Sequence, residues 1–258
     1  MNQSIYNSWL VGWVLKKIDK DVKTGGMIET MHRLTDSMVK LVVKNREKVK
    51  LTLKNEPVIL ISNHPSQVEV LILLGLLEKR DDAYLIADHS FLEILPSVDK
   101  HIIPVYINHR LDGKQKDSWK FNLLTRFHQS ESFCREIAHK KNIASINLAT
   151  DKVNNGGLVM IFPAAGELGG KFLSGLGYMI KNLKNPKKVK IVMVHVRGTS
   201  TWDYLRLIPI VRNFLPKVYI TFAEPIPAGQ FLAPEAKAIS ENVEKRYYEW
   251  VRGNSDNT

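Results

Sequence analysis

The chain has 258 residues, of which 44% are hydrophobic, and its formal net charge is +11. This length is enough to bury a substantial core and fits a single globular domain. The single cysteine, Cys134, excludes an internal disulfide framework and indicates a reducing compartment. The positive charge predicts an anionic partner. Since zinc-ligand spacing, an aromatic RNA-binding pattern and a basic helix are all missing, we expect no nucleic-acid binding.

The apolar runs are too short to predict a membrane-spanning helix. The longest, residues 9–15 and 70–77, fall well short of the about 20 residues that a spanning helix needs. No basic and then apolar leader with a cleavage site opens the chain. We therefore expect a cytoplasmic protein that is peripheral on the membrane rather than exported or integral.

Residues 1–45 are expected to form an N-terminal helical segment. Ile5, Trp9 and Trp13 recur at a spacing of four, which places them on one side of a helix, and two lysines follow. Tryptophan beside lysine suits a helix that lies in a membrane interface. Because Lys16 interrupts the apolar line, packing against the body of the protein is an equal alternative.

Residues 46–258 alternate short apolar stretches with helical ones. This pattern predicts an α/β domain with a central mixed, largely parallel sheet flanked by helices. Ligands of such sheets bind at the loops beyond the strand ends. The expected strands are 57–62, 83–87, 102–107, 158–162, 190–196 and 217–223. The expected helices of the whole chain are 5–18, 27–44, 67–79, 129–152, 174–184 and 234–251.

A histidine lies where the first of these strands gives way to a helix. Residues 57–62 form an apolar run rich in β-branched side chains, and residues 68–77 have the length and composition of a helix. A neutral imidazole at His64 can accept a proton from a hydroxyl, and Glu69 can hold the other ring nitrogen. The same spacing also fits a helix cap beside a surface charge, so the pair alone leaves both interpretations open.

Asn63, His64 and Glu69 form the pattern N-H-x4-E. It resembles the N-H-x4-D motif of the glycerolipid acyltransferase superfamily, the glycerol-3-phosphate and 1-acylglycerol-3-phosphate acyltransferases, with glutamate in place of aspartate. The resemblance makes residues 46–258 an acyltransferase-like α/β domain. Further segments similar to those of the family follow in the same order at residues 84–96, 103–110, 159–167 and 218–226.

The resemblance also implies where substrates bind. The arginine with which the family binds the acceptor's phosphate corresponds to His109 or Arg110. The family's F-P-E-G-T-R-S turn corresponds to the segment 159–167, where two alanines follow the proline and Lys171 is the closest cation. Small residues let a ligand approach the backbone N–H groups, which can stabilise an oxyanion. The expected substrate-binding residues are Asn63, Ser66, His109, Arg110, Phe162, Pro163, Ala164, Ala165, Gly166 and Lys171.

The family's activity is that of an O-acyltransferase. The resemblance implies transfer of a fatty acyl group from acyl-CoA or acyl carrier protein to the hydroxyl of lysophosphatidate or glycerol 3-phosphate in phospholipid biosynthesis. His64 and Glu69 are the expected catalytic pair. No cofactor is expected, and no metal, because the histidines are dispersed without ligand spacing. Contact with an anionic membrane would use the positive charge. The altered motifs leave open a catalytically weak relative that binds lipid or acyl chains.

Overall fold

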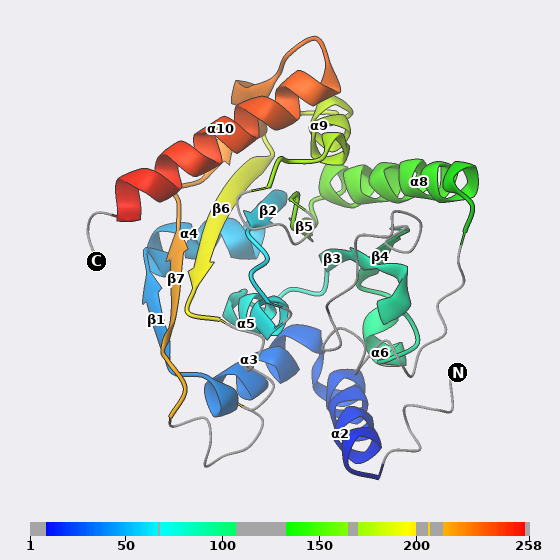
Figure 1. Ribbon diagram of the computed structural model, residues 1–258, viewed down its shortest axis with the longest axis vertical. Coiled ribbons are helices and arrows are strands. Elements are labelled where there is room, and N and C mark those ends of the chain that lie inside the picture. Colours follow the sequence, from blue (N-terminus) through cyan, green and yellow to red (C-terminus); the bar gives the residue numbers. More distant parts are fainter. Residues whose placement is uncertain are drawn as a thin grey trace.

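The computed structural model describes residues 9–66, 68–106, 133–164, 170–199, 206 and 214–255. Within these residues the strands form an eight-stranded sheet in the order β1-β7-β6-β2-β5-β3-β4, with β8 paired to β6 outside this path (Figure 1). Pairing is antiparallel between β6 and both β7 and β8 and parallel elsewhere, which confirms the mixed, largely parallel sheet. The strands are β1 (Leu41–Lys44), β2 (Val58–Ser62), β3 (Ala83–Asp88), β4 (Ile102–Val105), β5 (Leu158–Ile161), β6 (Lys190–Arg197), β7 (Val218–Phe222) and β8 (Ile226–Pro227).

Helices cover both faces of this sheet (Figure 1). One face packs against α2, α3, α4 and α5, and the other packs against α8, α9 and α10. Short helical turns connect some strands. The helices are α2 (Trp9–Gly25), α3 (Met27–Met38), α4 (Arg46–Asn55), α5 (Val68–Leu76), α6 (Pro96–Asp99), α8 (Arg135–Asn154), α9 (Ser174–Lys181) and α10 (Ala236–Ser255), with 3-10 turns η1 (His89–Phe91) and η4 (Ala228–Phe231).

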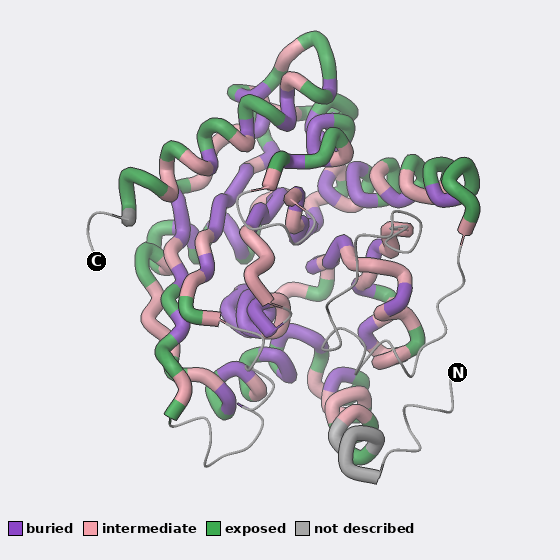
Figure 2. Tube along the Cα trace, viewed as in Figure 1, coloured by how far each residue is buried: buried purple, intermediate pink, exposed green. Residues whose placement is uncertain are grey.

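The central strand β2 shows why two layers of helices form. Val58 and Leu60 pack in the cluster with α3 and α5, whereas Ile59 and Ile61 pack in the cluster with α8, α9 and α10. All four side chains are fully buried, as expected of a strand with both faces covered. Figure 2 shows buried residues along the strands and exposed residues on the outer turns of α8 and α10. Since the faces are covered, the strand ends are left to carry a site.

The six predicted strands are confirmed to within two residues at each end. The predicted helix over 27–44 is wrong in its last part, because α3 ends at Met38 and residues 41–44 form β1. Val39 has an extended backbone, and the β-branched Val42 and Val43 pair in parallel with β7. Since β7 comes from the far end of the chain, no local pattern reveals this pairing.

Helix α4 was not among the predicted elements. Its segment is rich in lysine, yet it buries Val49, Thr52 and Leu53 while its lysines are exposed to solvent. Together with β1, it lies at the boundary that we placed between residues 45 and 46. The structure therefore adds a strand of the central sheet to the N-terminal segment, and the division itself stays a prediction.

Helix α2 contains the described part of the expected interfacial helix. Its Asp19 accepts a hydrogen bond from the N–H of Ser97 at 2.8 Å, which ties one side of α2 to α6. Trp13 lies on α2 with 65% of its surface exposed. Packing against the body and an exposed aromatic surface thus coexist on this helix. In the described part of the chain, none of the helices has both the length and the hydropathy needed to cross a bilayer.

Candidate active site

The carboxyl ends of the parallel strands β2, β5, β3 and β4 share one edge of the sheet. His64 follows the end of β2 by two residues, and Phe162 and His89 directly follow β5 and β3. Because neighbouring strands lie about 4.8 Å apart, side chains on these loops come close together. This carboxyl edge therefore brings together His64 and Phe162, two of the residues that the sequence singled out, with His89 further along it.

His64 and Glu69 are in contact. The Nδ1 atom of His64 hydrogen-bonds to Oε1 of Glu69, which lies in the first turn of α5. The backbone N–H of Ser66 donates to the same oxygen at 3.2 Å. An Nδ1–H that donates to the carboxylate leaves the lone pair of a neutral imidazole on Nε2. The pair therefore has the tautomer that a general base needs.

The exposure of the two side chains differs sharply. The Glu69 side chain is 0% exposed, whereas that of His64 is 27% exposed. The second carboxylate oxygen of Glu69, Oε2, is buried and makes no hydrogen bond with the described residues. A buried carboxylate with an unpaired oxygen is costly, and a positive charge on the adjacent ring reduces that cost. The carboxylate of Glu69 is therefore shielded from solvent and directed through Oε1 at the imidazole of His64.

Phe162 packs against one face of the imidazole of His64. Its ring stacks on His64 with centroids 4.7 Å apart and an interplanar angle of 29°. Phe162 follows β5, whose residues Leu158–Ile161 are all buried next to β2. The orientation of the His64 ring is thus set by a carboxylate on one helix and an aromatic ring on the neighbouring strand.

Asn63 extends the sheet by one step beyond β2. Its side-chain amide donates to the carbonyl oxygen of Val196 at 2.9 Å and accepts the N–H of the same residue at 2.8 Å. The amide thus takes the place of a strand partner for β6. The substrate-binding role expected of Asn63 stays a prediction, while its side chain is engaged with the backbone of β6.

Ser66 shapes the start of α5. Its hydroxyl oxygen accepts the backbone N–H of Val68 at 3.3 Å, which satisfies a donor in the first turn of the helix. The N–H of Ser66 already donates to Glu69. Both groups of Ser66 therefore support the position of the carboxylate, and a direct role of Ser66 in substrate binding stays a prediction.

Of the remaining expected site residues, the structure describes three, Pro163, Ala164 and Lys171. Pro163 and Ala164 directly continue the strand end that carries Phe162. Lys171 is exposed, and among the described residues no hydrogen bond or ion pair joins it to His64 or Glu69. His109, Arg110, Ala165 and Gly166 lie outside the described residues. The structure thus brings His64, Glu69 and Phe162 into contact and leaves the phosphate-binding residues as predictions.

A second group of side chains lies further along the carboxyl edge, beyond β3 and β4. The His89 ring stacks on Tyr106 at 4.9 Å, and Phe133 packs edge-on against Tyr106 at 5.1 Å. The ammonium of Lys141 lies 3.7 Å from the Phe133 centroid. Asn142 bonds to both the N–H and the carbonyl oxygen of Tyr106 at 2.7 and 3.0 Å. The start of α8 is therefore fastened to the end of β4.

Sequence reasoning missed Tyr247, which lies on α10. Its hydroxyl accepts the backbone N–H of Asn63 at 3.2 Å and donates to the carbonyl oxygen of Val194 at 3.0 Å. Burial raises the pKa of Tyr247 well above its usual value, so the hydroxyl keeps its proton. The sequence signal was an apolar position on the inner side of a C-terminal helix, which points to packing rather than to a site.

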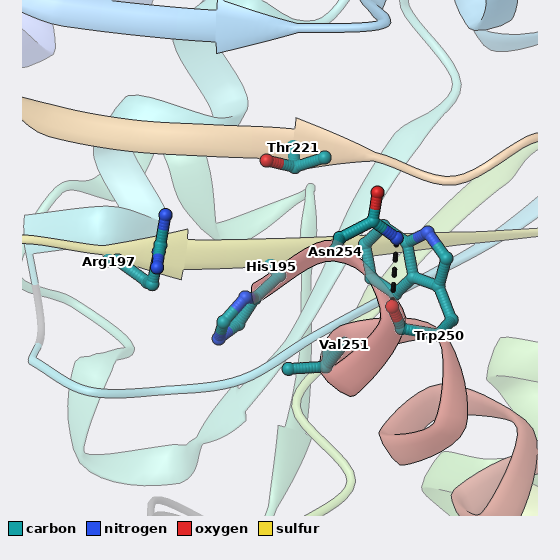
Figure 3. A pocket seen from close by; sticks show the side chains of 6 residues that line it. All are labelled: His195, Arg197, Thr221, Trp250, Val251 and Asn254. Carbon is teal, nitrogen blue, oxygen red and sulfur yellow. Dashed lines mark hydrogen bonds between the residues drawn. The ribbon is translucent and has the colours of Figure 1, made fainter. Parts of the chain in front are cut away.

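A small pocket lies between β6, β7 and α10 (Figure 3). Its volume is about 10 Å³, roughly what one water molecule requires. Burial and then Arg197 lower the pKa of His195 in this pocket to about 4, so the imidazole is neutral near pH 7. A shallow hollow of about 500 Å³ beside it is lined by Arg197, Lys217 and Tyr219, among others. Neither the pocket nor the hollow is lined by His64 or Glu69.

Comparisons with known proteins give a structural likeness. No family model matches the chain, and no curated protein matches it. Among solved structures it is similar to the crystal structure of the 1-acyl-sn-glycerophosphate (LPA) acyltransferase, PlsC, from Thermotoga maritima, with 21% sequence identity and a TM-score of 0.47. The match covers 93% of this chain and 80% of that chain. At this identity and TM-score the likeness assigns no activity, so the function must be argued from the residues of this chain.

Proposed function

We propose that this protein is an O-acyltransferase that transfers a fatty acyl group from a thioester donor, acyl-CoA or acyl carrier protein, to the hydroxyl of lysophosphatidate or glycerol 3-phosphate. The observation that carries the proposal is the contact between His64 and the buried Glu69 at the carboxyl edge. A surface cap would not need a fully buried carboxylate on the imidazole, whereas a general base gains from one.

The reaction follows from the tautomer of His64. Nε2 removes the proton of the acceptor hydroxyl while the oxygen attacks the thioester carbonyl carbon. The C–S bond then breaks, and the imidazolium returns the proton to the departing thiolate, so that an ester and a thiol are formed. General-base assistance of this kind contributes about 10²- to 10⁴-fold to the rate. Glu69 stabilises the imidazolium between the two proton transfers.

The other expected residues complete the proposed site. The backbone N–H groups of Ala164, Ala165 and Gly166 would stabilise the oxyanion that forms on the thioester carbonyl. Arg110, with His109 or Lys171, would hold the acceptor's phosphate, because a guanidinium bonds two phosphate oxygens at once. Positioning of donor and acceptor against His64 supplies further acceleration.

Peripheral contact with an anionic membrane would bring a lipid acceptor to this edge. The net charge of +11 supports such contact, since each Lys or Arg near an anionic bilayer contributes about 1 kcal/mol. Trp13, exposed on α2 next to Lys16 and Lys17, supports an interfacial position for that helix. An acidic acyl carrier protein would use the same positive charge.

The test measures thiol release from acyl-CoA and from acyl carrier protein thioesters. Lysophosphatidate, glycerol 3-phosphate or no acceptor is added, and wild type is compared with His64→Ala and Glu69→Ala. Release that requires an acceptor and disappears in His64→Ala would support the transferase and identify the acceptor. Equal inertness of wild type and His64→Ala, with vesicle binding retained, would replace it with a lipid-binding module.

A further inference from the structure

The hydroxyl of Tyr247 joins three segments that are distant in sequence. It accepts the N–H of Asn63, donates to the carbonyl oxygen of Val194, and lies 3.4 Å from Oδ1 of Asn63. Tyr247 is 2% exposed, so water does not offer an alternative partner to these groups. A single side chain of α10 thus connects the end of β2 to β6.

The backbone between β2 and His64 is held from two directions. The side-chain amide of Asn63 pairs with both backbone groups of Val196, and the backbone N–H of Asn63 is held by Tyr247. Asn63 is the residue directly before His64. The backbone from which the imidazole projects is therefore fixed to β6 by the side chain of one residue and to α10 by its main chain.

The position of Tyr247 is set in turn by close packing of α10. Its ring contacts Phe172 at 5.6 Å and Trp250 at 5.9 Å between centroids. A Cβ atom on Gly177 of α9 would lie 1.7 Å from the carbonyl oxygen of Ala236, so only glycine permits this approach of α9 to α10. The helix that carries Tyr247 therefore has little freedom to shift.

We propose that Tyr247 is a positioning residue for the reaction, whose hydroxyl fixes the loop of His64 so that Nε2 meets the acceptor hydroxyl in the reactive geometry. This inference rests on the proposed function. Tyr247 touches neither the imidazole nor, in the proposed mechanism, a substrate, and acts through Asn63. Loss of the hydroxyl should therefore reduce the rate of the chemical step without changing substrate affinity.

The experiment compares Tyr247→Phe with a matched variant of the same helix, Ser240→Ala. Both remove one buried hydroxyl from α10, and Ser240 also makes two hydrogen bonds, one from the N–H of Gly177 and one to the carbonyl oxygen of Leu173 at 3.1 Å. We expect Tyr247→Phe to lower kcat about 10-fold or more with KM unchanged, because small displacements of catalytic groups are costly. We expect Ser240→Ala to keep kcat per folded molecule.

A second measurement does not depend on activity. Hydrogen exchange of the backbone N–H of Asn63 should be slow in the wild type, become at least about 10-fold faster in Tyr247→Phe, and remain slow in Ser240→Ala. An active wild type with an unchanged kcat in Tyr247→Phe would overturn the positioning role. Unchanged exchange of the Asn63 backbone N–H would show that the Tyr247 hydroxyl does not hold this loop. If the wild type were inactive but showed the expected exchange pattern, the hydrogen bond between Tyr247 and Asn63 would be supported and the proposed transferase would be refuted.

Discussion

Buried polar groups differ in their hydrogen bonding between the amino edge of the sheet, where the parallel strands begin, and the carboxyl edge, where they end. At the amino edge, Arg80 uses all five of its N–H donors: two bond to Asp82, and the others bond to the carbonyl oxygens of Leu53, Glu56 and Gly156 at 2.8 to 3.1 Å. At the carboxyl edge, Glu69 leaves one buried oxygen without a hydrogen bond to the described residues. All donors of Arg80 thus have partners, whereas the contact of Glu69 with His64 leaves one carboxylate oxygen without a partner among the described residues.

This difference separates a side chain that stabilises the fold from the pair that we propose as the catalytic one. The Arg80 side chain is 5% exposed and joins α4, the start of β3 and the turn before β5. A satisfied network of this kind stabilises the folded state and offers nothing to a substrate. The side chain of His64 is 27% exposed, and when Nδ1 donates to Glu69 its Nε2 atom is an acceptor. Substitutions at the two edges should therefore affect different measurements.

The largest expected effect is that of His64→Gln on the reaction. Removing the base should lower kcat about 10²- to 10⁴-fold while the free energy of unfolding changes by less than about 1 kcal/mol. Acceptor-dependent thiol release and urea unfolding measure the two quantities. A large loss of stability with normal kcat per folded molecule would reverse the comparison of the edges.

Glu69→Gln should have the next largest effect. The amide keeps the shape of the side chain but cannot stabilise the imidazolium, so we expect kcat to fall about 10- to 10³-fold. Stability should be unchanged or slightly higher, since a buried charge is removed. Glu69→Asp, which shortens the reach by one methylene, should also lower kcat. Full activity of Glu69→Gln in a thiol-release assay would exclude the proposed support of His64.

Arg80→Met tests the amino edge. The change leaves the carbonyl oxygens of Leu53, Glu56 and Gly156 without their donor, and should lower the free energy of unfolding by about 3 kcal/mol. The activity of the folded protein should be unchanged. Lys79→Met, at the exposed neighbouring position, serves as the control for loss of a positive charge. A comparable midpoint shift in urea for the two variants would show that the network contributes no more than surface charge.

His195 sharpens the comparison, because it lies near the carboxyl end of β6 but on the face covered by α10. Its pKa is about 4 in the folded protein and 6.5 in the unfolded chain, so neutral His195 contributes stability above pH 6.5 that is lost as the pH falls toward 4. Allowing for partial exposure, the loss should be about 1–2 kcal/mol. Unfolding free energies between pH 4 and 7 should show a smaller slope in His195→Gln. Equal slopes in both proteins would contradict the lowered pKa of His195. The kcat of His195→Gln at pH 7 should equal that of the wild type.

Local patterns predicted the features that depend on neighbouring residues. The apolar run of β2, the helix that follows it and the spacing from His64 to Glu69 are all contained in residues 58–76, and the structure has the pair in contact. The stacking of Phe162 on His64 was not predicted, although Phe162 was expected at the site. It depends on β5 pairing with β2, which residue types near position 162 do not specify.

Features built from distant segments escaped the sequence analysis. Tyr247 reaches Asn63 only because α10 packs across β6, and Arg80 finds its carbonyl partners only after three segments meet. In each case the side chain bonds to backbone atoms, which every residue possesses, so the partner leaves no mark in the sequence. The strand β1 was hidden for the same reason, since its partner β7 lies at the other end of the chain.

Tyr106 and Phe133 are in contact at the carboxyl edge, although 26 residues separate them in the sequence. The two rings touch at the points where the chain leaves β4 and where it returns to begin α8, and Lys141 and Asn142 fasten the two points together. The residues at which the chain leaves β4 and enters α8 are therefore held together at one place. Doubling the number of residues between two such points costs only about 0.6 kcal/mol of closure entropy, so we expect changes of length between positions 106 and 133 to leave the contact of His64 with Glu69 intact. In the proposed function, His109 and Arg110, whose positions in the sequence lie between these two points, bind the acceptor's phosphate, so we expect substitutions there to change the choice of acceptor without moving the general base.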